Sequence, residues 1–111
     1  MTYTATWSQT ERDLEVMFER WGVPESDWDI ERYYHGRRIA GLEPHQRRVK
    51  VWFKLRGRYV ELENDQERSP AENLRPIYLV LNDRRLAEVR GLADLSAVSY
   101  THLTLPTIYS V

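Results

Sequence analysis

The sequence predicts an α+β fold in which an antiparallel three-stranded meander carries two helices packed on one face. Two segments have the periodicity of amphipathic helices, three have the alternation of strands, and a two-residue turn joins two of those strands. The chain has 111 residues, of which 41% are hydrophobic and 30% are charged. That is enough for one domain with a modest core, and we expect this domain to span residues 1–95.

The first helix is predicted over residues 8–21. Ser8 to Glu11 has the pattern of a capping box, in which a hydroxyl and a carboxylate each accept a hydrogen bond from a free backbone amide. Apolar residues recur at positions i, i+3, i+4 and i+7, and they are Leu14, Met17, Phe18 and Trp21. Gly22 and Pro24 then favour the end of the helix.

Residues 27–34 alternate with period two, which predicts a half-buried strand. One side of this strand would hold Trp28, Ile30, Arg32 and Tyr34. Its other side would hold Asp27, Asp29 and Glu31. Two glycines and a proline within residues 35–46 predict a loop after this strand.

Residues 48–63 predict a β-hairpin whose two-residue turn is Arg56-Gly57, because glycine suits a positive φ. The expected pairs on the core face are Phe53 with Val60 and Val51 with Leu62. The expected pairs on the opposite face are Lys54 with Tyr59, Trp52 with Glu61, and Lys50 with Glu63. A shift of one residue would mix the apolar and polar faces, so the pattern and the turn agree on this register.

A second helix is predicted from the capping box Ser69–Glu72, which has proline at its first helical position. Pro76 leaves two interpretations open, since it lacks an amide proton: the helix kinks there, or it begins later with Asn73 as its cap. Residues 77–81 are apolar, which predicts a helix covered all round that ends at Gly91. The predicted core is Leu14, Met17, Phe18, Trp21, Ile30, Val51, Phe53, Val60, Leu62, Ile77, Tyr78 and Leu81.

Residues 96–111 differ in composition from the rest of the chain, because all 16 basic and 17 acidic residues precede them. The stretch from Ala97 to Thr107 resembles one translated frame of a transposase-type sequencing adapter. Such strings occur at the ends of chains assembled from environmental DNA. We therefore expect residues 96–111 to be a non-native tail, and the natural gene to continue past Leu95. The alternative is a natural edge strand followed by a loose terminus.

Catalysis is not expected. The chain has no cysteine, which excludes disulfides and thiolate chemistry. It has neither the glycine spacing of a phosphate loop or dinucleotide site nor a nucleophile elbow. We expect no catalytic residue, no cofactor and no metal. No apolar run approaches the length of a membrane span and the N-terminus lacks a signal peptide, so a cytoplasmic protein without a membrane partner is expected.

Two weak metal signals remain. His35 and His45 lie ten residues apart in the predicted loop, but two histidines without cysteine are expected to be solvated loop residues and not metal ligands. The acidic strand side, with Lys50 on the neighbouring strand, has the residue types of a metal-dependent nuclease. Cross-strand pairing of opposite charges explains the same residues without any chemistry.

Nucleic-acid binding is the stronger alternative. Nine lysines and arginines lie between Arg32 and Arg58 against one acidic residue, Glu43. A basic and aromatic strand face could stack a base and hold phosphates, and the candidate residues are Lys50, Trp52, Lys54, Arg37 and Arg38. Against this, Glu61 and Glu63 are expected on the same face, paired across the strands with Trp52 and Lys50, and their carboxylates would weaken its positive potential.

Several segments resemble the opening of a group of bacterial and phage-borne J-domain proteins. They are residues 6–14 (TWSQTERDL), residues 17–22 (MFERWG) and the run from Asn73 through residues 77–81 to residues 90–95 (RGLADL). In that group an α+β region of about this size precedes a C-terminal J domain. Pro76 stands where a helix former such as alanine is expected, and Arg84 where an apolar residue is expected.

The resemblance implies a partner in a chaperone system. The His-Pro-Asp triplet through which J domains engage their ATP-driven chaperone is absent from the sequence. We therefore expect it in the part of the natural gene that follows the codon for Leu95. The leading hypothesis is a non-catalytic interaction module, the N-terminal region of a J-domain-type co-chaperone. The alternative is a small basic nucleic-acid-binding module of mobile-element origin. A continuous positive patch would favour nucleic acid, and an alternating surface would favour a protein partner.

Overall fold

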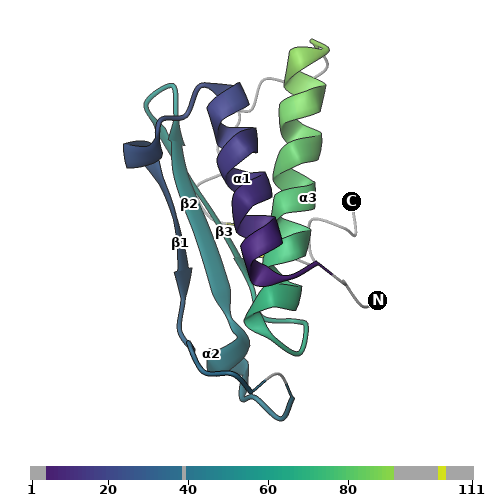
Figure 1. The fold of residues 1–111 in the computed structure, drawn as a ribbon. Helices are drawn as coiled ribbons and strands as arrows, with labels where there is room; N and C mark the ends of the chain where they lie inside the picture. Colours follow the sequence, from purple (N-terminus) through teal and green to yellow (C-terminus); the bar gives the residue numbers. More distant parts are fainter. Residues whose placement is uncertain (1–4, 39, 92–102, 105–111) are drawn as a thin grey trace.

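Two long helices lie side by side on one face of an antiparallel sheet in the computed structural model, which describes residues 5–38, 40–91 and 103–104 (Figure 1). The elements are α1 (Trp7–Trp21), the 3-10 turn η1 (Glu25–Asp27), β1 (Trp28–Arg32), α2 (Pro44–Arg47), β2 (Val49–Leu55), β3 (Arg58–Asn64), α3 (Pro70–Val89) and β4 (Leu103–Thr104). The predicted α+β meander β1-β2-β3 with two helices on one face is confirmed.

The helix α1 begins one residue earlier than predicted. Its N-cap is Thr6, whose hydroxyl oxygen accepts a hydrogen bond from the Gln9 amide at 3.1 Å, so the assignment of Ser8 as the cap is wrong. Thr6 has the extended backbone that a cap requires, whereas Ser8 already lies in the first turn. Gly22 ends the helix as predicted, with a left-handed φ of 81°.

The hairpin has the predicted register. Phe53 pairs with Val60 and Val51 with Leu62, while Lys50, Trp52 and Lys54 pair with Glu63, Glu61 and Tyr59. Both turn residues, Arg56 and Gly57, have positive φ, at 50° and 81°. This is the turn geometry that matches the twist of two paired strands. The register therefore follows from the turn and from the separation of the apolar and polar faces.

The strand β1 is shorter than the predicted residues 27–34. Asp27 belongs to η1, and the strand ends at Arg32 because the chain then turns back on itself. The amide of Arg38 donates to the hydroxyl of Tyr34 at 3.3 Å within this turn. Ile30 pairs with Val51, so β1 lies at one edge of the sheet.

The short helix α2 lies where only a loop was predicted. Glu43 and Gln46 form a capping box around it, and the Glu43 amide donates to the Gln46 side chain at 2.9 Å. Proline occupies the first helical position. The capping box and the proline of this short helix were therefore visible in the sequence, but the glycines of residues 35–46 led to the prediction of a loop.

The helix α3 runs through Pro76 without ending. Ser69 is its cap and accepts from the Glu72 amide at 3.3 Å, so the interpretation of Asn73 as the cap is wrong. Asn73 is instead fully buried. Its side-chain nitrogen Nδ2 donates to the backbone oxygens of Arg47 at 2.7 Å and Glu67 at 3.2 Å. These bonds tie the start of α3 to α2 and to the loop before α3.

The prediction that α3 is covered all round is wrong. Leu79 is 37% exposed, and Val89 near the end of the helix is more exposed still. The reason is architectural, because α3 packs against α1 and the sheet and its remaining side faces outward (Figure 1). The helix ends at Val89, followed by Gly91 with a positive φ, as predicted.

The core lies between the two helices and the sheet. Phe18 of α1 sits at its centre, with ring centroids 5.1 Å from Phe53 and 4.9 Å from Trp28. Nine of the twelve predicted core residues are buried, and the other three, Trp21, Ile30 and Tyr78, are partly buried against the core. Buried residues that the prediction left out are Val23, Leu42, Val49, Leu55, Leu74 and Val80.

Polar contacts hold the helices together near both ends. A guanidinium nitrogen of Arg75 in α3 lies 2.6 Å from the carboxylate of Asp13 in α1. At the other end, Glu88 accepts from the Trp21 indole at 3.4 Å and pairs with Arg56 of the hairpin turn. Among the described residues, none of the helices has the length and apolar content that crossing a membrane requires.

The predicted non-native tail, residues 96–111, lies outside the described residues except at β4. There Leu103 pairs with Leu62 and Thr104 with Glu63, in parallel with β3. A natural edge strand was the alternative interpretation of this tail, and β4 lies at the edge of the sheet beside β3.

Candidate functional site

The sheet face turned away from the helices, here called the outer sheet face, carries the predicted basic and aromatic residues. Its members, read from the alternation of the three strands, are Asp29, Glu31, Lys50, Trp52, Lys54, Tyr59, Glu61 and Glu63. Lys50, Trp52 and Lys54 thus share one face of β2, where the sequence placed them. They alternate in space with carboxylates of both neighbouring strands.

Lys50 is neutralised from two sides. Its Nζ lies 2.9 Å from a carboxylate oxygen of Glu61 and 3.5 Å from one of Glu31. The hydrogen bond with Glu61, assisted by the charge of Glu31, raises the pKa of Lys50 well above its ordinary value. The Cα partner of Lys50, Glu63, turns its carboxylate to Arg48 instead, at 3.1 Å. The positive charge of Lys50 is therefore neutralised by carboxylates of the sheet itself.

The aromatic residues of the outer sheet face are also engaged with each other. Trp52 stacks on Tyr59 with ring centroids 5.9 Å apart and an angle of 19° between the planes. Burial, with a further contribution from the Glu61 charge, raises the pKa of the Tyr59 hydroxyl. Lys54 is exposed beside this pair and makes no ion pair with the described residues.

Arg37 and Arg38 lie elsewhere, in the exposed turn that follows β1. No contact between described residues joins either arginine to Lys50, Trp52 or Lys54. The five candidate nucleic-acid contacts therefore fall into two groups, three on the outer sheet face and two in the turn beyond it.

The acidic residues of the metal hypothesis are separated. Asp27 lies in η1, the Asp29 carboxylate accepts from the Ile30 amide at 2.8 Å, and Glu31 pairs with Lys50. His35 accepts from the Arg32 side chain at 3.1 Å. Across residues 5–38 and 40–91, no three side chains of metal-binding type converge. The arrangement that a metal-dependent nuclease requires is thus missing from this part of the chain.

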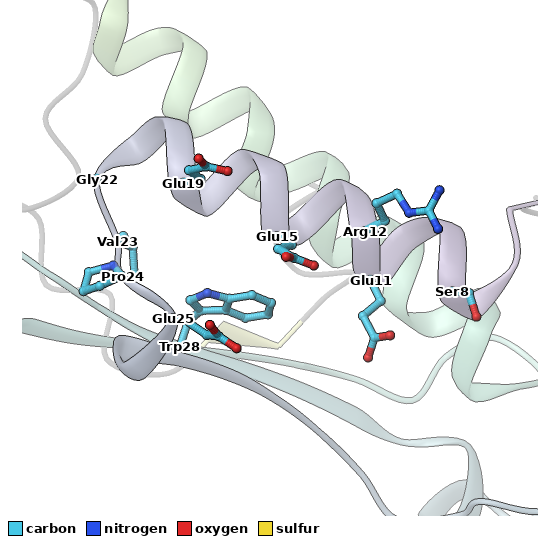
Figure 2. Close-up of a pocket in the computed structure, with 10 residues that line it drawn as sticks. All are labelled: Ser8, Glu11, Arg12, Glu15, Glu19, Gly22, Val23, Pro24, Glu25 and Trp28. Atoms are coloured by element: carbon cyan, nitrogen blue, oxygen red, sulfur yellow. The ribbon is translucent and has the colours of Figure 1, made fainter.

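A groove between α1 and the η1–β1 segment, here called the α1–β1 groove, is a feature that the sequence reasoning missed (Figure 2). It has a volume of about 1010 Å³. Its charged and aromatic lining consists of Glu11, Arg12, Glu15, Glu19, Glu25 and Trp28. Figure 2 shows Glu15 pointing toward the Trp28 indole and Glu25 beside the same ring.

Two local features build this groove. Glu11, Glu15 and Glu19 recur every four residues, so they form one column along the exposed side of α1. Gly22 and Pro24 then turn the chain back, and the short turn η1 brings Trp28 under that column. The glutamate spacing is visible in the sequence, but the opposite wall is visible only in the fold.

The carboxylates of the α1–β1 groove are uncompensated. Within the described ranges, none of Glu11, Glu15, Glu19 and Glu25 makes an ion pair or accepts a side-chain hydrogen bond. Like charges four residues apart on a helix destabilise it by about 0.2–0.5 kcal/mol per pair. The fold therefore carries a repulsive column of charge here that contributes nothing to its own stability.

Comparison of the chain with family models, with curated proteins and with solved structures found no match.

Proposed function

We propose that this chain is a non-catalytic protein-interaction module, the N-terminal region of a J-domain-type co-chaperone that acts in the cytoplasm. The observation that carries the proposal is the position of Lys50 between Glu61 and Glu31. A nucleic-acid backbone laid along β2 would meet a carboxylate on each side of its central cation. A protein surface can match alternating charges, because it can present both signs.

The chaperone context rests on the resemblance of residues 6–22 and 73–95 to J-domain proteins. In such proteins the J domain recruits the chaperone, which leaves a preceding domain free to bind another protein. Two long helices on a sheet give that domain a rigid surface, since α1 and α3 are tied together by the Arg75–Asp13 ion pair. The role assigned to this region is therefore binding rather than catalysis.

The proposal is tested at the gene by amplifying the source DNA past the codon for Leu95. We expect the reading frame to continue into helices that bear His-Pro-Asp. A natural gene that encodes residues 97–111 and then stops would contradict both the co-chaperone assignment and the adapter interpretation.

A second candidate is a small nucleic-acid-binding module of mobile-element origin. The observation in its favour is that Lys54, Arg37 and Arg38 are exposed cations without an ion pair to a described residue. A titration with labelled single-stranded DNA at several salt concentrations separates the two candidates. Each phosphate contact contributes about −0.7 to the slope of log K against log salt. We expect no saturable binding at physiological salt, and a steep slope that weakens in a Lys54→Ala variant would favour the second candidate.

A further inference from the structure

We propose that the α1–β1 groove binds an extended, arginine-containing segment of a partner protein in which every second residue is basic. The inference rests on the proposed protein-interaction function and deepens it, because it names the site and the chemistry of the ligand. Three features of the groove carry it: the charge of its glutamates, the spacing of three of them along α1, and the aromatic ring on its opposite wall.

The charge of the groove selects a basic ligand. Of the described residues that line it, four are glutamates and Arg12 is the one cation, in a chain whose net charge is only −1. Nucleic acid and anionic lipid would be repelled here. A basic peptide would relieve the repulsion between the glutamates as well as form new ion pairs, so binding gains from both effects.

The spacing of the carboxylates selects an extended backbone. Residues four apart on a helix are separated by about 6 Å along its axis, at about 1.5 Å per residue. Side chains on one side of an extended chain recur every two residues, or about 6.6 Å. Glu11, Glu15 and Glu19 therefore match three alternate residues of an extended segment lying along α1. The other side chains of that segment would point toward solvent.

Trp28 favours arginine over lysine. One side of its indole packs against Phe18, which holds the ring in place, and the ring also borders the groove opposite α1 (Figure 2). A guanidinium attracted by neighbouring carboxylates can stack on such a ring, within about 6 Å of its centroid. The chain already makes this contact elsewhere, where Arg32 lies 4.3 Å from the centroid of the Trp7 ring.

A second copy of the chain is the competing occupant, since it carries Arg37 and Arg38 in an exposed turn. Adjacent residues of an extended segment point to opposite sides, so only one of these two arginines could face the glutamate column at a time. The alternate spacing of the groove therefore favours a segment of a different protein.

The test is isothermal titration calorimetry on the full chain with the peptide Arg-Thr-Arg-Thr-Arg. The control peptide Arg-Arg-Arg-Thr-Thr has the same composition without the alternation. The groove variant is Glu11→Gln/Glu15→Gln/Glu19→Gln, in which all three side chains are exposed and keep their shape. The matched control variant is Asp29→Asn/Glu31→Gln/Asp83→Asn, which removes three exposed carboxylates from other surfaces. Circular dichroism verifies that both variants fold.

We expect the alternating peptide to bind the wild-type chain at least about tenfold more tightly than the groove variant, a difference of about 1.4 kcal/mol. The control variant should keep the affinity within about twofold, because it loses the same charge elsewhere. Equal weakening of both variants, or equal affinity of the two peptides, would mean general charge attraction and would overturn the inference.

Two further results would overturn it in distinguishable ways. Absence of peptide binding to the wild-type chain removes the groove site but leaves the co-chaperone proposal, which depends on the gene beyond Leu95. Sedimentation that shows a dimer, dissociated both by the groove variant and by Arg37→Glu/Arg38→Glu, would assign the groove to a second copy of the chain.

Discussion

The outer sheet face and the α1–β1 groove contain similar charged residues in opposite arrangements. On the sheet face, Lys50 lies within ion-pair distance of both Glu31 and Glu61. Four glutamates line the groove, and none of them makes an ion pair with a described residue. Compensated charges stabilise the fold that contains them, whereas uncompensated ones cost stability. The difference is that Lys50 is paired within the sheet, whereas the glutamates of the groove have no ion pair with a described residue.

The largest expected effect comes from Phe18, which supports Trp28 from behind. We predict that Phe18→Ala lowers the free energy of unfolding by about 3–5 kcal/mol, because it leaves a cavity at the centre of the aromatic cluster. Urea denaturation followed by circular dichroism measures this. A loss below about 1 kcal/mol would mean that Trp28 and Phe53 are not packed on this ring as described.

A smaller effect is expected on the outer sheet face. Lys50→Met should lower the free energy of unfolding by about 1 kcal/mol, since Glu31 and Glu61 would then face each other without a cation. The pKa of Lys50 is raised in the folded state, so its contribution is fully present below its ordinary value of about 10.5. That contribution is lost as the pH rises through the higher folded value.

The pH dependence gives Lys50→Met its check. The stability difference between wild type and variant should stay constant from neutral pH to about pH 10 and shrink only in stronger alkali. A difference that disappears already at neutral pH would contradict the pairing of Lys50 with both carboxylates.

The same chemical change should have opposite signs on the two surfaces. Glu11→Gln/Glu15→Gln/Glu19→Gln removes two repulsive pairs and should raise the free energy of unfolding by about 0.4–1 kcal/mol. Glu61→Gln on the sheet face should lower it by about 0.5 kcal/mol, because Lys50 loses its nearest partner. Thermal and urea denaturation at low salt measure both. If both variants changed the free energy of unfolding in the same direction, the two surfaces would not differ in charge compensation.

The smallest expected effect concerns Tyr59. Its pKa is raised by burial and by Glu61, so the folded state resists its ionisation more than the unfolded state does. Stability is therefore unaffected below the unfolded pKa of about 10 and falls as the pH rises above it. Tyr59→Phe should make this alkaline loss shallower. An unchanged alkaline profile would mean that the hydroxyl is freely solvated.

The hairpin shows how much of the fold could be predicted from the sequence. Its register follows from Arg56-Gly57 and from two faces of different polarity, both of which are local. The cap of α1 and the course of α3 were predicted less well, since Thr6 competes with Ser8 and Pro76 is tolerated inside a packed helix. The start and course of α3 depend on tertiary contacts, such as those of the buried Asn73 side chain.

The candidate site was less accessible to prediction. The basic residues of β2 were placed on the correct face, but their neutralisation by Glu31 and Glu61 depends on side-chain directions across three strands. The groove was missed because its walls come from α1 and from a turn whose direction is set by Gly22 and Pro24. A column of glutamates without cations four residues away was the one signal the sequence held.

The most direct test of the contrast between the two surfaces is a single nuclear magnetic resonance experiment on isotope-labelled full chain. The amide spectrum is recorded during titration with the alternating arginine peptide and, separately, with a thymidine oligonucleotide. We predict shifts at residues 8–28 with the peptide and no saturable shifts with the oligonucleotide. Oligonucleotide shifts centred on Lys50, Trp52 and Lys54, with the groove silent toward the peptide, would contradict it.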